Sequence, residues 1–307
     1  EIGSGLVGSE MCIRDRFYND RKLDFEDMLI SDYNHIRAFI KIEDGCDNFC
    51  SYCIIPYVRG SVRSKNFETV IKEAKLLTQK GHKEIVLTGI HTGHYMDNGY
   101  DLTDLINELS KIEDLLRIRI SSIEITELND KFLNMLSTNK KVCDHLHIPL
   151  QAGSDEILKK MNRKYDLKYY EEKIKKIRMI RPDISITTDI IVGFPYETDK
   201  LFNETLEFSR KMNFSKIHVF PYSIRLGTSA ANMPNQVDES IKKERVKKLM
   251  DLSEIMEKEY YNKFVGKELD ILVEECDNNV SIGHSSNYLM IRLNEKLEVG
   301  QIYKRII

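Results

Sequence analysis

The sequence of 307 residues lacks several features that would place it in well-known classes. No apolar run approaches the ~20 residues that cross a membrane, and the first residues show no basic stretch followed by an apolar one, as in a signal peptide. Its six cysteines are irregularly spaced, which excludes the dense disulfide framework of a small secreted domain. A formal net charge of −3 gives no overall indication of a nucleic-acid partner. These absences predict a cytoplasmic protein without a membrane segment.

A chain of this length predicts one large domain and one small domain. Residues 1–16 have neither helical nor strand periodicity, and we interpret them, including Cys12, as a foreign leader. Residues 17–34 are interpreted as a linker. From residue 35 onward, short runs of strand-forming residues alternate with helical patterns, which is typical of βα units around a parallel sheet. We therefore predict a large domain at residues 35–265 and a small one at 266–307.

Six strand-helix repeats in the large domain predict a partial (β/α) barrel, and a doubly wound open sheet remains an alternative. A helix is predicted at 66–80, and a long amphipathic helix at 239–264 is followed by Gly266. Beyond Gly266, short alternating strands with turn signals predict a small β-barrel. The predicted strands of the large domain are 37–42, 84–88, 117–121, 145–148, 184–192 and 216–220.

Three cysteines, Cys46, Cys50 and Cys53, form a C-x3-C-x2-C pattern directly after the first predicted strand. Catalytic groups in barrels of this kind collect at the carboxyl ends of the strands. Three thiolates can each bind one iron of a cubane and leave the fourth iron open, so that S-adenosylmethionine can chelate it and be cleaved by one electron. The alternative is a zinc site, which needs a fourth ligand that no neighbouring residue in the sequence supplies. Cys143 and Cys276 are isolated, and we interpret them as small apolar residues.

The residues around these cysteines, GCDNFCSYCIIPYVRGSVRS, resemble the cluster motif of the radical S-adenosylmethionine methylthiotransferases. Within that family the chain is most similar to the enzymes that modify N6-threonylcarbamoyladenosine in tRNA. The resemblance runs from about residue 17 to the end of the chain. It is supported by the segments 84–95, 117–124, 145–165, 189–198, 218–231 and 283–289.

The resemblance implies a partial (β/α)6 barrel, followed by a small all-β RNA-binding barrel called TRAM. It implies a [4Fe–4S] cluster and S-adenosylmethionine as cofactors, and an electron donor such as flavodoxin or ferredoxin. The implied reaction adds a methylthio group at carbon 2 of the modified adenine, with the tRNA anticodon loop as partner. The implied cluster ligands are Cys46, Cys50 and Cys53, and the implied cofactor-binding residues are Tyr52, Thr88, Gly89, Glu124, Gln151 and Asp189.

Basic residues follow the cysteine motif, and we predict that Arg59, Arg63 and Lys65 contact RNA phosphates, the alternative being solvated surface charges. The small domain itself carries five Lys or Arg against seven Asp or Glu, so its RNA-binding role is implied by the resemblance alone.

The chain departs from the family in three ways. The family has an amino-terminal domain with three cysteines and a second [4Fe–4S] cluster that carries the sulfur, and nothing in this sequence corresponds to it. We therefore expect a fragment in which sulfur insertion by this chain alone is in question. Tyr196 stands where the family usually has glycine, whose backbone freedom tyrosine lacks, and Ile125 stands where proline is common. Two other functions remain open, a methylthiotransferase that acts on an aspartate of a ribosomal protein and a non-catalytic RNA-binding or zinc-stabilised module.

Overall fold

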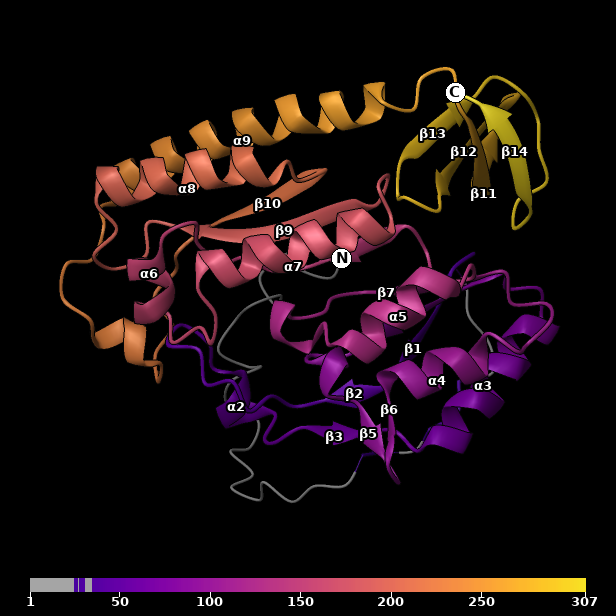
Figure 1. The fold of residues 1–307 in the computed structure, drawn as a ribbon, viewed down its shortest axis with the longest axis horizontal. Helices are drawn as coiled ribbons and strands as arrows, with labels where there is room; N and C mark the ends of the chain where they lie inside the picture. Colours follow the sequence, from indigo (N-terminus) through magenta and orange to yellow (C-terminus); the bar gives the residue numbers. More distant parts are fainter. Residues whose placement is uncertain (1–24, 27, 31–34) are drawn as a thin grey trace, which may run out of the picture.

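The computed structural model describes residues 25–26, 28–30 and 35–307 of the chain. The predicted leader at 1–16, with Cys12, lies outside the described residues, as does most of the predicted linker at 17–34. Among the described residues, no helix combines the length and apolar character that a bilayer-spanning helix requires. Figure 1 shows a large α/β region that is connected through one long helix to a separate small sheet at the carboxyl end of the chain.

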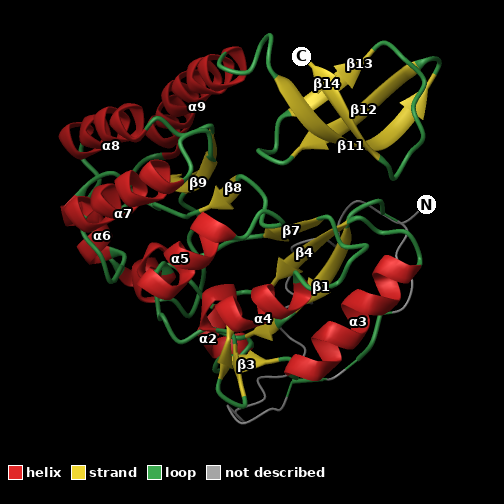
Figure 2. Ribbon diagram, turned by 45° about the vertical axis from the view of Figure 1, so that its right-hand side comes forward, coloured by secondary structure: helices red, strands yellow, loops and turns green. Residues whose placement is uncertain are grey.

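Six parallel strands form the inner layer of the large region, and Figure 2 shows helices packed outside them. They pair in two three-stranded sheets, in the orders β1-β4-β7 and β8-β9-β10. Backbone hydrogen bonds on both sides of Ile118 connect β7 to the residues just before β8, through Lys141 at 2.7 Å and Cys143 at 2.9 Å. The partial six-stranded barrel is thereby confirmed. The strands are β1 (Ala38–Lys41), β4 (Glu84–Thr88), β7 (Arg117–Ile120), β8 (His145–His147), β9 (Ser185–Val192) and β10 (Lys216–Pro221).

Amphipathic helices cover the outer face of these strands (Figure 2). In α3 the side chains of Val70, Ala74 and Leu77 are buried on one face, as their helical spacing predicts. Asn66 and Lys80, the ends of the predicted helix, are its caps, and the Asn66 side chain accepts a hydrogen bond from the backbone of Thr69. The helices are α2 (Ile55–Val58), α3 (Phe67–Gln79), α4 (Leu102–Leu109), α5 (Asp130–Thr138), α6 (Asp155–Lys160), α7 (Leu167–Ile180), α8 (Asp199–Met212) and α9 (Glu239–Asn262).

Short strands and 3-10 turns lie in the loops of the large region. Two small hairpins pair β2 with β3 and β5 with β6. Tyr196, after β9, has a φ of +70°, so the glycine usual in the family would suit this position better. The short elements are β2 (Glu43–Asp44), β3 (Arg63–Ser64), β5 (Met96–Asp97), β6 (Tyr100–Asp101) and the 3-10 turns η1 (Thr92–His94), η2 (Ile125–Glu127) and η3 (Ser229–Asn232).

The small region is all-β, as predicted, and consists of one antiparallel sheet in the order β13-β12-β11-β14. Its own apolar core is formed by the end of α9 and the inner face of the sheet. Among the described strands no pairing joins β13 to β14, so this region is an open sheet in place of the expected closed barrel. The strands are β11 (Glu268–Asp277), β12 (Val280–Ser285), β13 (Met290–Leu293) and β14 (Ile302–Ile306).

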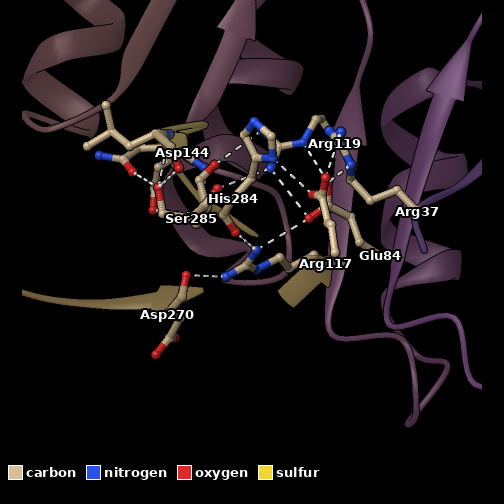
Figure 3. Close-up of polar contacts among 12 residues, drawn as sticks. Arg37, Glu84, Arg117, Arg119, Asp144, Asp270, His284 and Ser285 are labelled. Atoms are coloured by element: carbon tan, nitrogen blue, oxygen red, sulfur yellow. Dashed lines mark hydrogen bonds and ion pairs between the residues drawn. The ribbon is translucent and has the colours of Figure 1, made fainter. Parts of the chain in front are cut away.

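A buried ion-pair network connects this sheet to the amino-terminal ends of the barrel strands, as Figure 3 shows. Glu84, at the start of β4, is fully buried and pairs with Arg119 at 2.6 Å and Arg117 at 3.4 Å. Burial raises the pKa of Glu84, but the two guanidinium groups outweigh it and leave that pKa below its ordinary value. The arginines also donate to backbone carbonyls of the sheet, Arg117 to His284 at 3.1 Å and Arg119 to Ser285 at 3.4 Å. The sheet is therefore attached at the end of the barrel where the strands begin.

Aromatic contacts add to the same interface. Tyr288 stacks on the ring of His145, with centroids 4.7 Å apart, and the guanidinium of Arg119 lies 4.7 Å from the tyrosine ring centre. His145 Nε2 is 3.0 Å from the hydroxyl of Thr187. Because His145 is buried beside Arg119, its pKa lies well below its usual value, and the ring is neutral in the folded protein.

The neutral state of His145 predicts acid sensitivity. A histidine in the unfolded chain has a pKa of about 6.5. Below that pH the unfolded chain binds a proton at this residue, whereas His145 in the folded protein does not. Neutral His145 therefore contributes fully to the free energy of unfolding above about pH 6.5. This contribution is lost as the pH falls toward the pKa of His145 in the folded protein. Urea unfolding at about pH 7.5 and about pH 5.5 should show a larger loss of stability for the natural chain than for His145→Gln. Equal losses in the two proteins would contradict this prediction.

Candidate functional site

The cysteine loop starts where β1 ends and is closed by the β2-β3 hairpin. Figure 1 places this hairpin and α2 at the end of the large region away from the small sheet. The backbone N–H of Cys46 donates to the carbonyl of Gly60 at 3.1 Å. Gly45, just before Cys46, has a φ of +88°, and a Cβ there would lie 2.1 Å from the carbonyl oxygen of Ser61. The first cysteine is thus held in place by a backbone contact that only glycine permits.

The replacement Gly45→Ala should disturb this loop. A positive φ costs an alanine about 1 kcal/mol, and here the added methyl group also meets backbone that cannot rotate away. Gly81→Ala is the matched control, because Gly81 has a φ of +98° with nothing within 4 Å of the added Cβ. We expect urea unfolding to show a larger loss of stability for Gly45→Ala, together with weaker iron binding. Equal effects of the two changes would show that the contact with Ser61 is unimportant.

The three predicted ligands lie together in this loop. All are free thiols; Cys50 is buried, and Cys46 and Cys53 are partly exposed. Burial raises the pKa of Cys53, and the negative charges of Cys50 and Cys46 raise it further. Their mutual repulsion would be relieved by a bound cation, because metal ions bind thiolates. Three soft sulfur donors in one loop, two of them partly exposed, therefore fit an iron–sulfur cluster.

Arg163, from the loop after α6, connects the cysteines to another predicted residue. One guanidinium nitrogen lies 3.2 Å from Cys50 Sγ, and another forms an ion pair with Glu124. Sequence reasoning missed Arg163, because a basic residue in a loop carries no signal of the thiol that it will contact. Tyr52 is partly buried near the same groups, and burial raises its pKa well above the usual value, so its hydroxyl stays protonated.

Three of the predicted cofactor-binding residues line one hollow beside the cysteine loop. Tyr52, Gln151 and Asp189 surround a space of about 360 Å³, together with Arg225. Gln151 has a φ of +68°, and its backbone pairs with β9, donating to the Asp189 carbonyl at 2.8 Å. Asp189 is also 3.3 Å from the ring of His147. The space has the size of a small-molecule site and presents polar groups of both charges to a ligand.

Thr88 and Gly89 lie at the end of β4, next to Glu43. A Cβ on Gly89 would be 2.8 Å from Glu43 Oε2, so this glycine permits a close approach of backbone and carboxylate. The other oxygen, Glu43 Oε1, is buried without a hydrogen-bond partner among the described residues. Burial raises the pKa of Glu43 to about 7, against the opposing hydrogen bond from the backbone of His91. Thr88 and Gly89 thus adjoin the cysteine loop through Glu43. They do not line the hollow that is formed by Tyr52, Gln151 and Asp189.

Two histidines that sequence reasoning did not single out lie beside Cys46. The rings of His91 and His94 stack with centroids 3.9 Å apart, and both are near Glu127. His91 Nδ1 is 3.9 Å from Cys46 Sγ. Burial lowers the pKa of His91, but its bonds to Cys46 and Glu127 outweigh that effect and raise it to about 10. His91 is also the residue that the zinc alternative would need as a fourth ligand.

The predicted RNA-contacting residues divide into two groups. Arg59 and Arg63 pair with Asp44, at 3.7 and 2.9 Å, and Lys41 joins them at 2.7 Å. These three cations around one carboxylate leave an excess of positive charge at the cysteine end of the barrel. Lys65, in contrast, is buried and pairs with Glu73 of α3, so its ammonium group is not presented to a phosphate.

Similarity to known proteins identifies the family of this chain. A model of the Radical SAM superfamily matches residues 40–209. The threonylcarbamoyladenosine tRNA methylthiotransferase MtaB of Bacillus subtilis (strain 168) is 44% identical over 83% of this chain and 58% of its own length. The MtaB of Rickettsia prowazekii (strain Madrid E) is 36% identical over 97% of this chain and 74% of its own length. The tRNA-2-methylthio-N(6)-dimethylallyladenosine synthase of Thermoanaerobacter sp. (strain X514) is 43% identical, with coverages of 83% and 55%.

A solved structure with the same fold is coproporphyrinogen III oxidase (HemN) from Escherichia coli, described as a radical SAM enzyme. The TM-score is 0.55 at 16% identity, with 72% of this chain and 53% of that chain covered. The chain spans only a little over half of the length of two of the curated relatives named above, 58% and 55%.

Proposed function

Because this chain belongs to the radical SAM superfamily, and within it to the tRNA methylthiotransferases, we propose that it is the catalytic portion of a tRNA-modifying radical enzyme. The observation that carries the proposal is the group of three free thiols at the carboxyl end of β1, in a segment that the superfamily model matches. When bound, a [4Fe–4S] cluster and S-adenosylmethionine supply the reductive cleavage that starts the reaction. The chain's own residues hold and orient these groups.

Each proposed residue has a defined task. Cys46, Cys50 and Cys53 bind the cluster, and the Arg163 guanidinium beside Cys50 offsets part of its negative charge. The hollow lined by Tyr52, Gln151 and Asp189 holds the nucleoside part of S-adenosylmethionine, with Tyr52 excluding water from one side. The contacts proposed for the methionine part and the sulfonium end are Thr88, Gly89 and Glu124.

The proposed substrate is N6-threonylcarbamoyladenosine next to the anticodon, modified at carbon 2. The two MtaB relatives act on this nucleoside by name, while the synthase from Thermoanaerobacter is named for dimethylallyladenosine. A base in an anticodon loop is unpaired and can turn into a protein site, where its edges become accessible. Loss of the 2-methylthio derivative of one of these two nucleosides, in the tRNA of cells lacking the gene, would decide between them.

The cationic group at the cysteine end is the proposed contact for the tRNA phosphates. Arg59 and Arg63 follow the cysteine loop in the chain, and together their positive charge exceeds the negative charge of Asp44, with which both pair. We expect the double change Arg59→Ala and Arg63→Ala to weaken tRNA binding by roughly tenfold and to flatten its salt dependence. Arg210→Ala, which removes an exposed arginine paired with Glu259, is the control and should leave binding unchanged. Equal binding by all three proteins in a filter assay would exclude this surface.

The small sheet lies at the opposite end of the strands from the cysteine loop. Strands of three to eight residues place the two ends of the barrel roughly 10–25 Å apart. A tRNA that contacts both ends therefore has to follow the side of the barrel. We propose that the sheet acts as a distant RNA contact, as the TRAM resemblance implies.

Anaerobic reconstitution with iron and sulfide tests the whole proposal. We expect about four irons and four sulfides per chain, and dithionite-dependent release of 5′-deoxyadenosine from S-adenosylmethionine. One zinc per chain with no 5′-deoxyadenosine would instead establish a zinc-stabilised, non-catalytic module. Methylthio transfer by the chain alone is not required for the proposal, because the relatives are longer than this chain.

A further inference from the structure

His91 stands out among the polar residues near the cysteine loop because it lies between a cluster ligand and a carboxylate. Its side chain is buried, and its backbone N–H donates to Glu43 Oε2 at 2.6 Å. One ring nitrogen, Nε2, forms an ion pair with Glu127 and lies 3.4 Å from Asn48 Nδ2, and the other, Nδ1, lies 3.9 Å from Cys46 Sγ. These contacts fix both the position and the rotation of the imidazole ring.

We propose that His91 is a positioning residue that donates a hydrogen bond to the cluster-bound sulfur of Cys46 and thereby makes the cluster easier to reduce. The inference rests on the proposed function, since it assumes that Cys46 binds iron. An iron-bound thiolate only accepts hydrogen bonds, so the ring nitrogen that faces Cys46 Sγ, Nδ1, is the donor. Hydrogen bonds to cluster sulfurs stabilise the more negative, reduced state, and this raises the reduction potential.

The local packing supports a fixed donor. Glu127 has its second oxygen bonded to the backbone N–H of Glu124 at 3.0 Å, so the carboxylate that orients His91 is itself held. Gly93 permits this arrangement, because a Cβ there would lie 2.0 Å from Glu127 Oε2. The ring of His94 covers one face of His91 and gives it a second steric constraint.

A metal site built from His91, His94 and Glu127 is the competing interpretation. Their ligand atoms lie within 4.8 Å of one another. However, His91 Nδ1 is directed at the sulfur of Cys46, and its Nε2 is already used by Glu127. Hydrogen bonding to Cys46 accounts for both nitrogens without an additional ion.

The test is the midpoint potential of the reconstituted chain, measured by redox titration followed with electron paramagnetic resonance. We expect His91→Phe, which keeps a flat ring without nitrogens, to load iron fully and to have a more negative midpoint potential. His91→Gln, which retains an amide donor, should recover part of the shift. His94→Phe is the matched control, because it keeps the stacked ring and has no bond to the sulfur, and its potential should equal that of the natural chain.

Three results would overturn the inference. The first is an unchanged midpoint potential in a fully loaded His91→Phe protein, which would leave the proposed function intact. The second is a further tightly bound metal ion per chain that is lost on changing His91, His94 or Glu127, which would establish the competing metal site. The third is failure of the natural chain to assemble a cluster at all, which would reject the proposed function as well. If His91→Phe does not fold, His91→Leu replaces it, and a negative shift is again expected because leucine has no hydrogen-bond donor.

Discussion

Cys50→Ala is expected to abolish cluster assembly and to reduce formation of 5′-deoxyadenosine below detection. Cys50 is the buried member of the three thiols, and its sulfur contacts Arg163 at 3.2 Å. Its loss leaves two protein ligands for a cubane that needs three, so one iron has no anchor. It also leaves the buried guanidinium without its sulfur partner. Iron and sulfide analysis after anaerobic reconstitution measures the first effect, and chromatography of the reaction products measures the second.

The matched control for this change is Cys276→Ala. Cys276 lies on β11 of the small sheet, far from the cysteine loop. Its replacement by alanine removes the same chemical group, a thiol. Its iron content and product yield should equal those of the natural chain. If Cys50→Ala retained full iron content, or if Cys276→Ala lost it, the assignment of the cluster to the β1 loop would fail. Cys46→Ala and Cys53→Ala should behave as Cys50→Ala does.

The sequence predicted the large region well because its strands are locally encoded. The run EIVLT has three consecutive apolar residues and lies between a turn and a glycine, and the structure forms β4 over the same residues, Glu84–Thr88. The predicted helix at 66–80 ends at its two caps, since Asn66 is a strong capping residue. The expected closure of the small region into a barrel was wrong, because pairing between distant strands does not appear in a local pattern and the described strands form an open sheet.

The site residues show a similar division. Cys46, Cys50 and Cys53 could be found from spacing, since all three lie in one loop. The placement of Lys65 could not be predicted, because its partner Glu73 faces it only after α3 has formed. His91 gave no local signal either, as its importance depends on Cys46 and Glu127, which come from other parts of the chain. Tertiary contacts between loops thus determine the residues that surround the cysteines.

The second large effect is expected for Glu84→Gln at the interface between barrel and sheet. Glu84 is fully buried, and its carboxylate balances Arg117 and Arg119. Removing one partner of a buried ion pair leaves uncompensated charge in a medium that solvates it poorly, at a cost of about 3 kcal/mol. Urea unfolding should therefore show a loss of that size. Because the pKa of Glu84 is lowered in the folded protein, the loss should be largest above about pH 4.5 and should shrink as the pH falls further.

Glu295→Gln is the control, because its exposed pair with Arg305 lies in the same sheet and is screened by water. It should leave the unfolding midpoint nearly unchanged. The interface also predicts where Glu84→Gln acts. Arg117 and Arg119 donate hydrogen bonds to backbone carbonyls of the sheet. The Glu84 carboxylate orients both guanidinium groups, so without it these hydrogen bonds should weaken. The sheet should then detach from the barrel more often. Faster hydrogen exchange at β11 and β12 than at β9 would support this reasoning. Uniform acceleration across the chain would instead show that Glu84 stabilises the barrel alone, and that the small sheet is held by the apolar contacts of α9.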